Sequence, residues 1–409
     1  MLRVAQLVII NGRELLLVLG NLDLAISGDF YTSRLYWGTV NGTFVDGTTD
    51  AGVGLEENGM GSTIGDFDND GHQDWFVTSI YICEEYRKPY FEAYGPGGGM
   101  IFGYTGNRLY KNNGQRKFTD KTDDAGVRPG GWAWGAAFLD FDNDGDLDLI
   151  HTNGFDDTES TDFDFLHHTA TLLYQNNHAD TGEVHFDSVG DTKGITDRRD
   201  GRGLFVFDFD NDGDQDVYIV SNSDKPVFYR NDGGNSRDWI RVKVMEAEAE
   251  RESLGAKVYL VSPKFDREIL REIRSAAAFS AQGESVAHFG LAHEAAQKFT
   301  VRVYWPVTNN TRVINNVQRR TVLVVRDLRG RRNSVEVTSS PDQSLSECRK
   351  MAVTSISKLP SHGHVVRHHN YVTYYPAPGF TGEDSFHYVV SDGITSSTGK
   401  VKVKVGELF

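Results

Sequence analysis

One acidic segment of nine residues, present in three copies, limits what this chain can fold into more than any other feature. The copies span residues 66–74, 140–148 and 208–216, and each carries Asp at positions one, three, five and nine and Gly at position six. Carboxylates this close repel one another, and a hard divalent cation that accepts about six to eight oxygen ligands relieves the repulsion. Glycine permits the sharp turn that such a loop needs. The repeats therefore predict three Ca²⁺ sites.

Each predicted site draws its ligands from alternate residues of one segment. Positions one, three, five and nine would offer carboxylate oxygens, and position seven a backbone carbonyl. An acidic, solvated turn without an ion is the alternative for a single copy, but three near-identical copies favour calcium. The metal-binding residues that we expect are Asp66, Asp68, Asp70, His72, Asp74, Asp140, Asp142, Asp144, Asp146, Asp148, Asp208, Asp210, Asp212, Asp214 and Asp216.

The residues after each acidic segment distinguish it from an EF-hand. That motif has a bidentate Glu at position twelve, where this chain has Val77, His151 and Ile219. The neighbouring residues are β-branched and aromatic, such as Trp75 and Phe76 in the first copy, and such residues favour strands. We therefore expect the acidic segments to join β-strands and not helices.

The composition narrows the classes of partner. The chain has 409 residues, enough for several domains, and 43 glycines, which suit turn-rich β structure. The net charge of −16 disfavours nucleic acid and anionic membrane surfaces as partners. No apolar stretch is long enough to cross a bilayer, so we expect no membrane insertion. Two distant cysteines, Cys83 and Cys348, indicate neither a disulfide framework nor a metal pair.

The repeat is longer than its acidic segment. A second pair of strands follows each acidic loop, and in residues 107–120 the turn between them is Asn113-Gly114. Four strands per repeat, with acidic segments that start 74 and 68 residues apart, are typical of the blades of a β-propeller. Residues 20–24 align with residues 145–149, and leucines at positions 15, 17 and 19 replace the first three Asp. We therefore expect the chain to begin inside a repeat whose loop binds no metal.

The Asp-Phe-Asp-Asn-Asp-Gly loops and the Asn-Asn-Gly turns resemble the FG-GAP or VCBS repeats of integrin-α-type propellers. The resemblance covers residues 1–235 and implies an all-β fold, a partial β-propeller of about three to four blades. Complete propellers of this type have more blades. We therefore expect this part to be open and to expose the apolar edge of a blade that a neighbour would otherwise cover.

Residues 236–332 alternate as half-buried strands do, for example in residues 239–244 and 301–305. Their succession is similar to the ASPIC/UnbV domain, which in the cartilage acidic protein 1 family follows such a propeller, and it implies a small β domain. Ala292 and the pair Val307-Thr308 depart from the turns of that family. His288 is either a metal or catalytic residue or a packed, hydrogen-bonded one, and the neighbouring Phe289 favours packing.

The C-terminal segment is expected to form a separate module. A polar linker over residues 333–349 precedes it. Residues 350–409 resemble a cadherin-like or bacterial Ig-like sandwich, and the segment is long enough only for a partial sandwich made of the later strands. His362, His364, His368 and His369 could hold zinc, but no spacing rule of zinc sites is met, so a solvated hairpin is favoured.

Two insertions separate strands of the propeller repeats, at residues 81–106 and 154–169. Successive connections in an antiparallel meander alternate between its two ends, so the insertions should lie at the end opposite the acidic loops. Long connections on a rigid scaffold often carry binding sites, and these would contribute Tyr86, Tyr90, Tyr94, Tyr104, Asp156, Asp157 and Asp162. The alternative is that they only fill a gap between blades.

The resemblance implies a non-enzymatic, calcium-binding scaffold, extracellular or at the cell surface, that binds an extracellular protein or a polysaccharide. The alternative is a secreted hydrolase or lyase with a carboxylate or metal site on the face opposite the calcium loops. The chain has no Gly-x-Ser-x-Gly, His-Glu-x-x-His or phosphate-loop motif, so we predict no catalytic residue. The dense candidates for the alternative are Asp156, Asp157, Glu159, His167 and His168.

Overall fold

The computed structural model forms two compact units, Met1–Ser339 and Ser340–Phe409, each with its own sheets. It describes residues 23–405 except residues 84, 86–104, 156–168, 223, 247–250, 263–266, 275–276, 280, 293, 328–334, 339–351, 368–371, 378 and 392–395.

Four antiparallel sheets, called sheets 1 to 4, make up the N-terminal part of the first unit. The strands of each sheet follow one another in chain order, as in a meander. Sheet 1 contains β1 (Leu24–Ile26), β2 (Arg34–Gly38) and β3 (Phe44–Asp46). Sheet 2 contains β4 (Ser62–Gly65), β5 (Asp74–Val77), β6 (Arg108–Asn112) and β7 (Phe118–Asp120). Sheet 3 contains β8 (Ala133–Leu139), β9 (Asp148–Asn153), β10 (Leu172–Asn176) and β11 (Phe186–Ser188). Sheet 4 contains β12 (Gly201–Phe207), β13 (Asp216–Ser221) and β14 (Val227–Tyr229).

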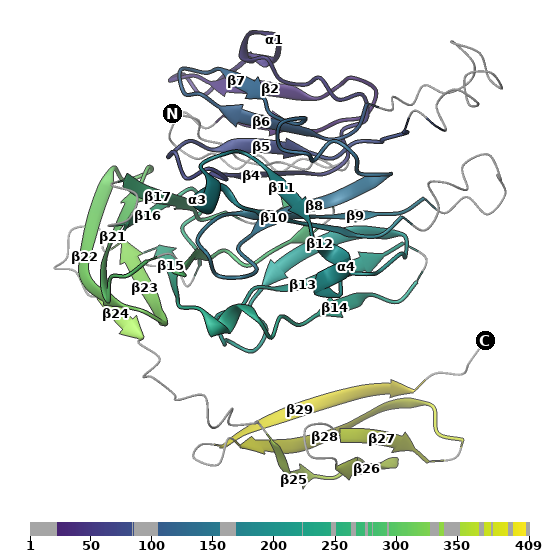
Figure 1. Ribbon diagram of the computed structural model, residues 1–409. Helices are drawn as coiled ribbons and strands as arrows, with labels where there is room; N and C mark the ends of the chain where they lie inside the picture. Colours follow the sequence, from purple (N-terminus) through teal and green to yellow (C-terminus); the bar gives the residue numbers. More distant parts are fainter. Residues whose placement is uncertain are drawn as a thin grey trace. The chain divides into compact units, whose positions relative to one another are not determined.

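The four sheets stack face to face in chain order (Figure 1). Apolar side chains fill each gap, because alternate residues of every strand point to opposite faces. The gap between sheets 1 and 2 holds Leu35 and Trp75, the next gap holds Phe76 and Leu149, and the last holds Leu139 and Val217. None of the sheets that the described residues form closes on itself. The prediction of an all-β, partial propeller is confirmed.

Each acidic segment joins two strands, as its flanking residues predict: β4 to β5, β8 to β9 and β12 to β13. The next connection leaves the opposite end of the sheet, because the strands are antiparallel. The described ends of the two insertions lie there in a small apolar cluster of Ile80, Ile82, Trp132 and Phe155. Trp132 stacks on Phe155 with 4.0 Å between the ring centroids. The acidic loops and the insertions therefore lie at opposite ends of the sheets.

Short helical turns occupy some of the remaining connections. They are α1 (Thr48–Ala51), α3 (His178–Thr181), α4 (Gly190–Lys193) and the 3-10 turn η2 (Gly234–Ser236). Within the part of the chain that the structure describes, no helix has the length and the apolar character needed to cross a membrane.

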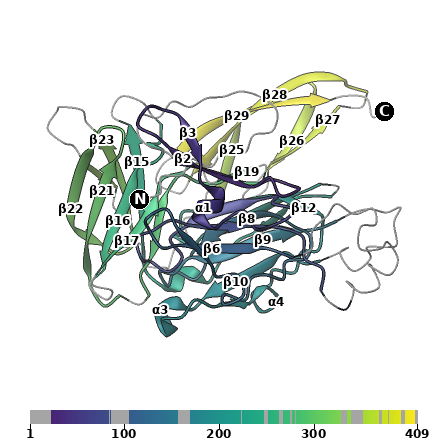
Figure 2. The ribbon, with the colours of Figure 1, turned by 90° about the horizontal axis from the view of Figure 1, so that it is seen from above.

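The C-terminal domain of the first unit consists of two four-stranded sheets and lies beside the stack (Figures 1 and 2). One sheet has the order β20 (Ala287–Gly290), β15 (Trp239–Glu246), β23 (Thr321–Asp327), β24 (Val335–Thr338). The other has the order β17 (Arg267–Glu272), β16 (Lys257–Ser262), β21 (Lys298–Trp305), β22 (Asn310–Gln318). Alternating residues such as Val301 and Val303 fill the core between them. β24 pairs with β23, so this sheet extends past residue 332 into the segment for which we expected a linker.

A hairpin of this domain reaches into the stack. It consists of β18 (Ala277–Ala278) and β19 (Ala281–Gln282). β18 lies beside β4, β8 and β12, the first strands of sheets 2, 3 and 4. The neighbouring residues bond to two of those strands, since Arg274 donates to the carbonyl of Ile64 and the N–H of Glu284 donates to the carbonyl of Val206. The hairpin therefore holds the first strands of three sheets together.

The second unit contains a three-stranded sheet of β25 (Ala352–Lys358), β28 (Gly382–Ser391) and β29 (Ser396–Val405). β26 (Gly363–Arg367) pairs with β27 (Val372–Pro376) beside it. His362 stacks on Phe380, and His364 stacks on Tyr375. His368 and His369, the other members of the predicted histidine cluster, lie outside the described residues.

Candidate metal centre

The three acidic loops share one backbone conformation. At position six, Gly71, Gly145 and Gly213 have φ angles of 86°, 98° and 94°. A residue with a side chain would be strained at these angles, which explains the glycine. The turn lets the position-one carboxylate accept a hydrogen bond from the position-six N–H, at 2.9, 3.0 and 3.0 Å in the three loops. The loop geometry thus follows from the spacing of Asp and Gly.

The position-nine aspartates attach each loop to its sheet. One oxygen of Asp74, Asp148 and Asp216 accepts the N–H of the position-two Phe. The other oxygen accepts a backbone N–H from the following strand pair, at 2.8 Å in each sheet; the donors are Asn112, Asn176 and Asn231. In sheet 1 the N–H of Gly38 donates to Asp23 in the same way, at 2.9 Å. Position nine therefore has a structural role in all four sheets.

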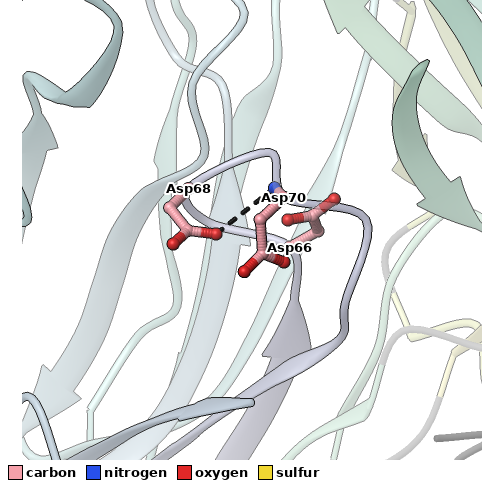
Figure 3. Close-up of side chains that lie close together, drawn as sticks. All are labelled: Asp66, Asp68 and Asp70. Carbon is pink, nitrogen blue, oxygen red and sulfur yellow. Dashed lines mark hydrogen bonds between the residues drawn. The ribbon is translucent and has the colours of Figure 1, made fainter. Parts of the chain in front are cut away.

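Carboxylates converge in each loop. Oxygens of Asp66, Asp68 and Asp70 lie within 4.8 Å of one another, and Figure 3 shows this group. In the second loop the group is Asp140, Asp142 and Asp148, and in the third loop it is Asp208, Asp210 and Asp216. Such clusters of carboxylate oxygens suit Ca²⁺, a hard cation that prefers oxygen ligands.

Two properties of these carboxylates fit a bound cation. Oδ1 of Asp66 and Oδ1 of Asp142 are buried and accept no hydrogen bond within the described part of the chain, and such burial is costly for a charged group. Burial, together with repulsion between neighbouring carboxylates, raises the pKa of Asp140 to about 7 and that of Asp144 to about 9. A bound Ca²⁺ would satisfy these oxygens and offset their repulsion.

Hydrogen bonds connect each loop to the next one. Asn69 Nδ2 donates to Gly145 O at 3.2 Å and to Asp146 Oδ1 at 3.1 Å. Asn143 makes the equivalent bonds to Gly213 O and Asp214 Oδ1, both at 3.2 Å. The side chains at position seven of the second and third loops therefore bind the preceding loop. That position seven offers a metal its backbone carbonyl stays a prediction.

A basic side chain from β6 reaches the first loop. Lys111 Nζ forms ion pairs with Asp68 and with Asp70, the latter at 2.8 Å. The equivalent residue of sheet 3 is Gln175, whose neutral amide donates to Asp142 at 2.8 Å. Arg237 also approaches Asp142, at 3.1 Å, but from an exposed position. The first loop therefore contains a half-buried competitor for a metal ion at a position where the second loop has an amide.

The C-terminal domain covers the acidic loops with arginines that the sequence analysis did not assign to the site. Arg271 is buried, and it donates to Asn69 Oδ1 at 3.1 Å and to Gly145 O at 3.0 Å, so it connects the first two loops. Arg241 forms a buried ion pair of 2.7 Å with Asp208 of the third loop. Nothing in the strand pattern distinguishes these arginines from exposed ones, because the loops are far away in sequence.

Strand β20 meets the second loop through its backbone. The N–H of Gly290 donates to Asp140 Oδ2 at 2.9 Å, and a Cβ at this residue would lie 2.4 Å from that oxygen, so a larger residue does not fit. His288 Nε2 lies 2.6 Å from Asn143 Oδ1. Burial holds the pKa of His288 well below its usual range. His288 is therefore a packed, hydrogen-bonded residue in this structure.

The residues predicted for ligand recognition and for the alternative enzyme fall in the two insertions. Of the first insertion the structure describes residues 81–83, 85, 105 and 106, and of the second residues 154, 155 and 169. The candidates outside the described residues are Tyr86, Tyr90, Tyr94, Tyr104, Asp156, Asp157, Glu159, Asp162, His167 and His168.

Comparison with known proteins assigns the parts of the chain. Residues 20–77 and 100–151 match the FG-GAP-like repeat, residues 246–332 match ASPIC and UnbV, and residues 306–404 match a bacterial Ig domain. The Ig match begins inside the C-terminal domain of the first unit, whereas the second unit begins at Ser340.

Two relatives match about two thirds of the chain. Cartilage acidic protein 1 of Mus musculus is 28% identical over 274 residues, and that of Homo sapiens is 28% identical over 275 residues. Each match covers 65% of this chain and 36% of the relative, so the chain spans about a third of the length of these relatives. The chain therefore combines FG-GAP-like repeats, an ASPIC and UnbV domain and a bacterial Ig domain, in the order that its motifs predict.

Proposed function

We propose that this chain is a non-enzymatic scaffold that binds Ca²⁺ in its three acidic loops and presents a binding surface for a protein or a polysaccharide outside the cell. Each loop would hold the ion through the carboxylates of positions one, three, five and nine. The observation that carries this proposal is the convergence of three carboxylates in every loop. In the first two loops, Asp66 and Asp142 also have a buried oxygen without a hydrogen-bond partner among the described residues.

Calcium supplies the positive charge that balances the carboxylates of the loops. It is a hard cation whose oxygen ligands need no strict geometry, so it tolerates loops that differ in sequence at positions seven and eight. The loops and their counter-ions also tie the sheets to the C-terminal domain through Arg271 and Arg241. A metal bound in the loops would therefore stabilise the whole first unit and not only one turn.

The location and partner class are supported by the relatives. Both are named for cartilage, a tissue whose matrix lies outside cells and consists of proteins and polysaccharides. Extracellular modules commonly bind calcium with dissociation constants of roughly 10⁻⁴ to 10⁻³ M, which suits the calcium concentration outside cells. We carry over only this class of location and partner.

Thermal unfolding with and without calcium tests the proposal. The unfolding temperature of the full chain should be higher in excess Ca²⁺ than in EGTA, since a ligand at about 100 times its dissociation constant adds roughly 2.7 kcal/mol per site. Asp142→Ala should weaken binding more than Asp146→Ala, because the Asp146 side chain binds the preceding loop. Equal unfolding temperatures in Ca²⁺ and EGTA at low ionic strength would show that the loops are not calcium sites.

A further inference from the structure

The stack of sheets has a regular pattern of covered faces. In sheet 2, Phe67, Phe76 and Leu109 are fully buried because sheet 3 covers them. The equivalent positions of sheet 3 are Phe141, Ile150 and Leu173, which are at most 8% exposed because sheet 4 covers them. These positions are equivalent in the structure as well as in the sequence, because the position-nine Asp accepts the same backbone hydrogen bond in each sheet.

Sheet 4 presents the same positions without a covering sheet among the described residues. They are Phe209, Tyr218 and Phe228, and Phe207 lies next to them; we call these four residues the sheet 4 outer face. Phe209 is 58% exposed and Phe228 is 40% exposed, and their rings pack on each other with 5.1 Å between centroids. Exposed aromatic clusters of this kind indicate an interaction surface.

The other end of the stack has the complementary face. In sheet 2, Trp75, Val77, Tyr110 and Phe118 pack against sheet 1. Their equivalents in sheet 1 are Leu24, Ile26, Tyr36 and Phe44, which we call the sheet 1 outer face. Phe44 is 51% exposed, and the other three are half-buried. One chain therefore carries both halves of the contact that joins its own neighbouring sheets.

The hydrogen bonds that connect each acidic loop to the next one also stop at sheet 4. Asn69 and Asn143 each donate to the next loop, whereas Asn211, at the same position of the last loop, is exposed. The position-two carbonyls of the first two loops accept from the next sheet, since Asn176 donates to Phe67 O and Asn231 donates to Phe141 O. The polar edge of sheet 4 is thus built like edges that a following sheet covers.

We propose that the sheet 4 outer face binds the sheet 1 outer face of a second copy of this chain. The contact would repeat between two chains the packing that joins sheets 1 to 4 within one chain. Made twice, in a reciprocal dimer, it would cover both outer faces of the described sheets and would bring two sets of four sheets together, within the usual range of about four to eight propeller blades. Reciprocal contacts of unlike faces close into a ring, which limits the assembly to a dimer.

One departure from the repeat allows a specific test. Gly38 occupies the position of Asn176 and Asn231 and makes the same backbone bond, at 2.9 Å, but it has no amide side chain. The contact with a second copy therefore lacks the side-chain bond to the carbonyl of Phe209. Gly38→Asn should supply this donor and should tighten the dimer, by about threefold to tenfold for one exposed hydrogen bond.

The test measures the molar mass of the full chain in calcium by sedimentation equilibrium over about 1 to 100 μM. The wild type should shift from monomer to dimer with concentration. Phe209→Glu and Phe44→Glu should each raise the dimer dissociation constant by about tenfold or more, because each places a charge in an apolar contact. Val313→Glu is the matched control, since Val313 is 52% exposed on β22, away from both outer faces, and should change nothing.

Mixing the two variants identifies which faces meet. A chain with Phe209→Glu and a chain with Phe44→Glu can form one intact contact together, so the mixture should contain more dimer than either variant alone. A wild type that stays monomeric at every concentration would refute the proposal. Loss of the dimer with Phe209→Glu but not with Phe44→Glu would also refute it, because two sheet 4 outer faces would then be meeting each other.

Discussion

At the scale of residues, the acidic loops combine features that the sequence predicts with one that it does not. The convergence of the carboxylates can be predicted because each loop lies within nine consecutive residues. The spacing of two residues between Asp positions brings their side chains together around one turn. Lys111 is different, since it reaches Asp68 and Asp70 from a strand about forty residues later. Its role depends on the pairing of β5 with β6, which a local pattern does not specify.

The ion pairs of Lys111 should weaken calcium binding to the first loop. Lys111→Gln, which reproduces Gln175 of sheet 3, should therefore raise the calcium affinity of that loop by roughly tenfold, or about 1.4 kcal/mol. Isothermal titration of Ca²⁺ into the full chain measures the change. The reverse substitution Gln175→Lys is the matched control and should weaken the second loop. An unchanged titration for Lys111→Gln would mean that the lysine does not compete with the metal.

At the scale of elements, strand β9 contains a histidine where the equivalent strands have aliphatic residues. His151 is fully buried and lies at the position of Val77 in β5 and Ile219 in β13. Its ring packs against Phe76 and Tyr174, with 6.3 and 5.8 Å between centroids. The sequence predicts the strand from its aliphatic and β-branched residues. It does not predict the burial of this ring, because His is common at surfaces as well.

His151 should make the stability of sheet 3 depend on pH. Burial lowers its pKa to about 4, whereas an unfolded His has a pKa of about 6.5. The unfolded chain therefore binds the proton first, and the contribution of His151, complete above pH 6.5, is lost as the pH falls towards 4. At pH 5 the loss is about 2 kcal/mol.

Urea unfolding at pH 7 and pH 5 measures this loss. His151→Val copies Val77 and should reduce the difference between the two pH values by about 2 kcal/mol. His288, which burial also keeps neutral, remains in both proteins and does not affect the comparison. The same pH dependence in both proteins would show that His151 is protonated in the folded state at pH 5.

At the scale of the whole molecule, the C-terminal domain of the first unit places positively charged arginines against the acidic loops. The motif order predicts that this domain follows the repeats, but it does not predict where the domain packs. That position depends on Arg271, Arg241 and the Gly290 backbone meeting three loops at once, and each contact spans a large sequence separation. Strand patterns report burial within a domain and carry no information on a contact between domains.

Arg271 should matter more to the metal-free protein than to the calcium-bound one. Arg271 is buried, and its positive charge acts to lower the pKa of Asp66 and Asp140. Arg271→Met removes the hydrogen bonds of a charged group, which contribute roughly 1.5 to 3 kcal/mol each, and a bound Ca²⁺ would supply part of the positive charge that is lost. Arg271→Met should therefore lower the unfolding temperature strongly in EGTA and less in calcium. Arg302→Met is the control, because Arg302 pairs with Glu268 and packs on Tyr259, away from the loops. Equal losses with and without calcium for Arg271→Met would contradict this account.

The position of the β18–β19 hairpin has a consequence for the synthesis of the chain. The hairpin lies beside β4, β8 and β12, yet all three strands precede it in sequence. Synthesis proceeds from the N-terminus, and N-terminal domains fold first. The nascent sheets therefore leave the ribosome before the segment that joins their first strands exists. Until residues 277–282 are translated, those strands have one exposed side, and the rate of translation beyond residue 235 sets how long chaperones have access to it.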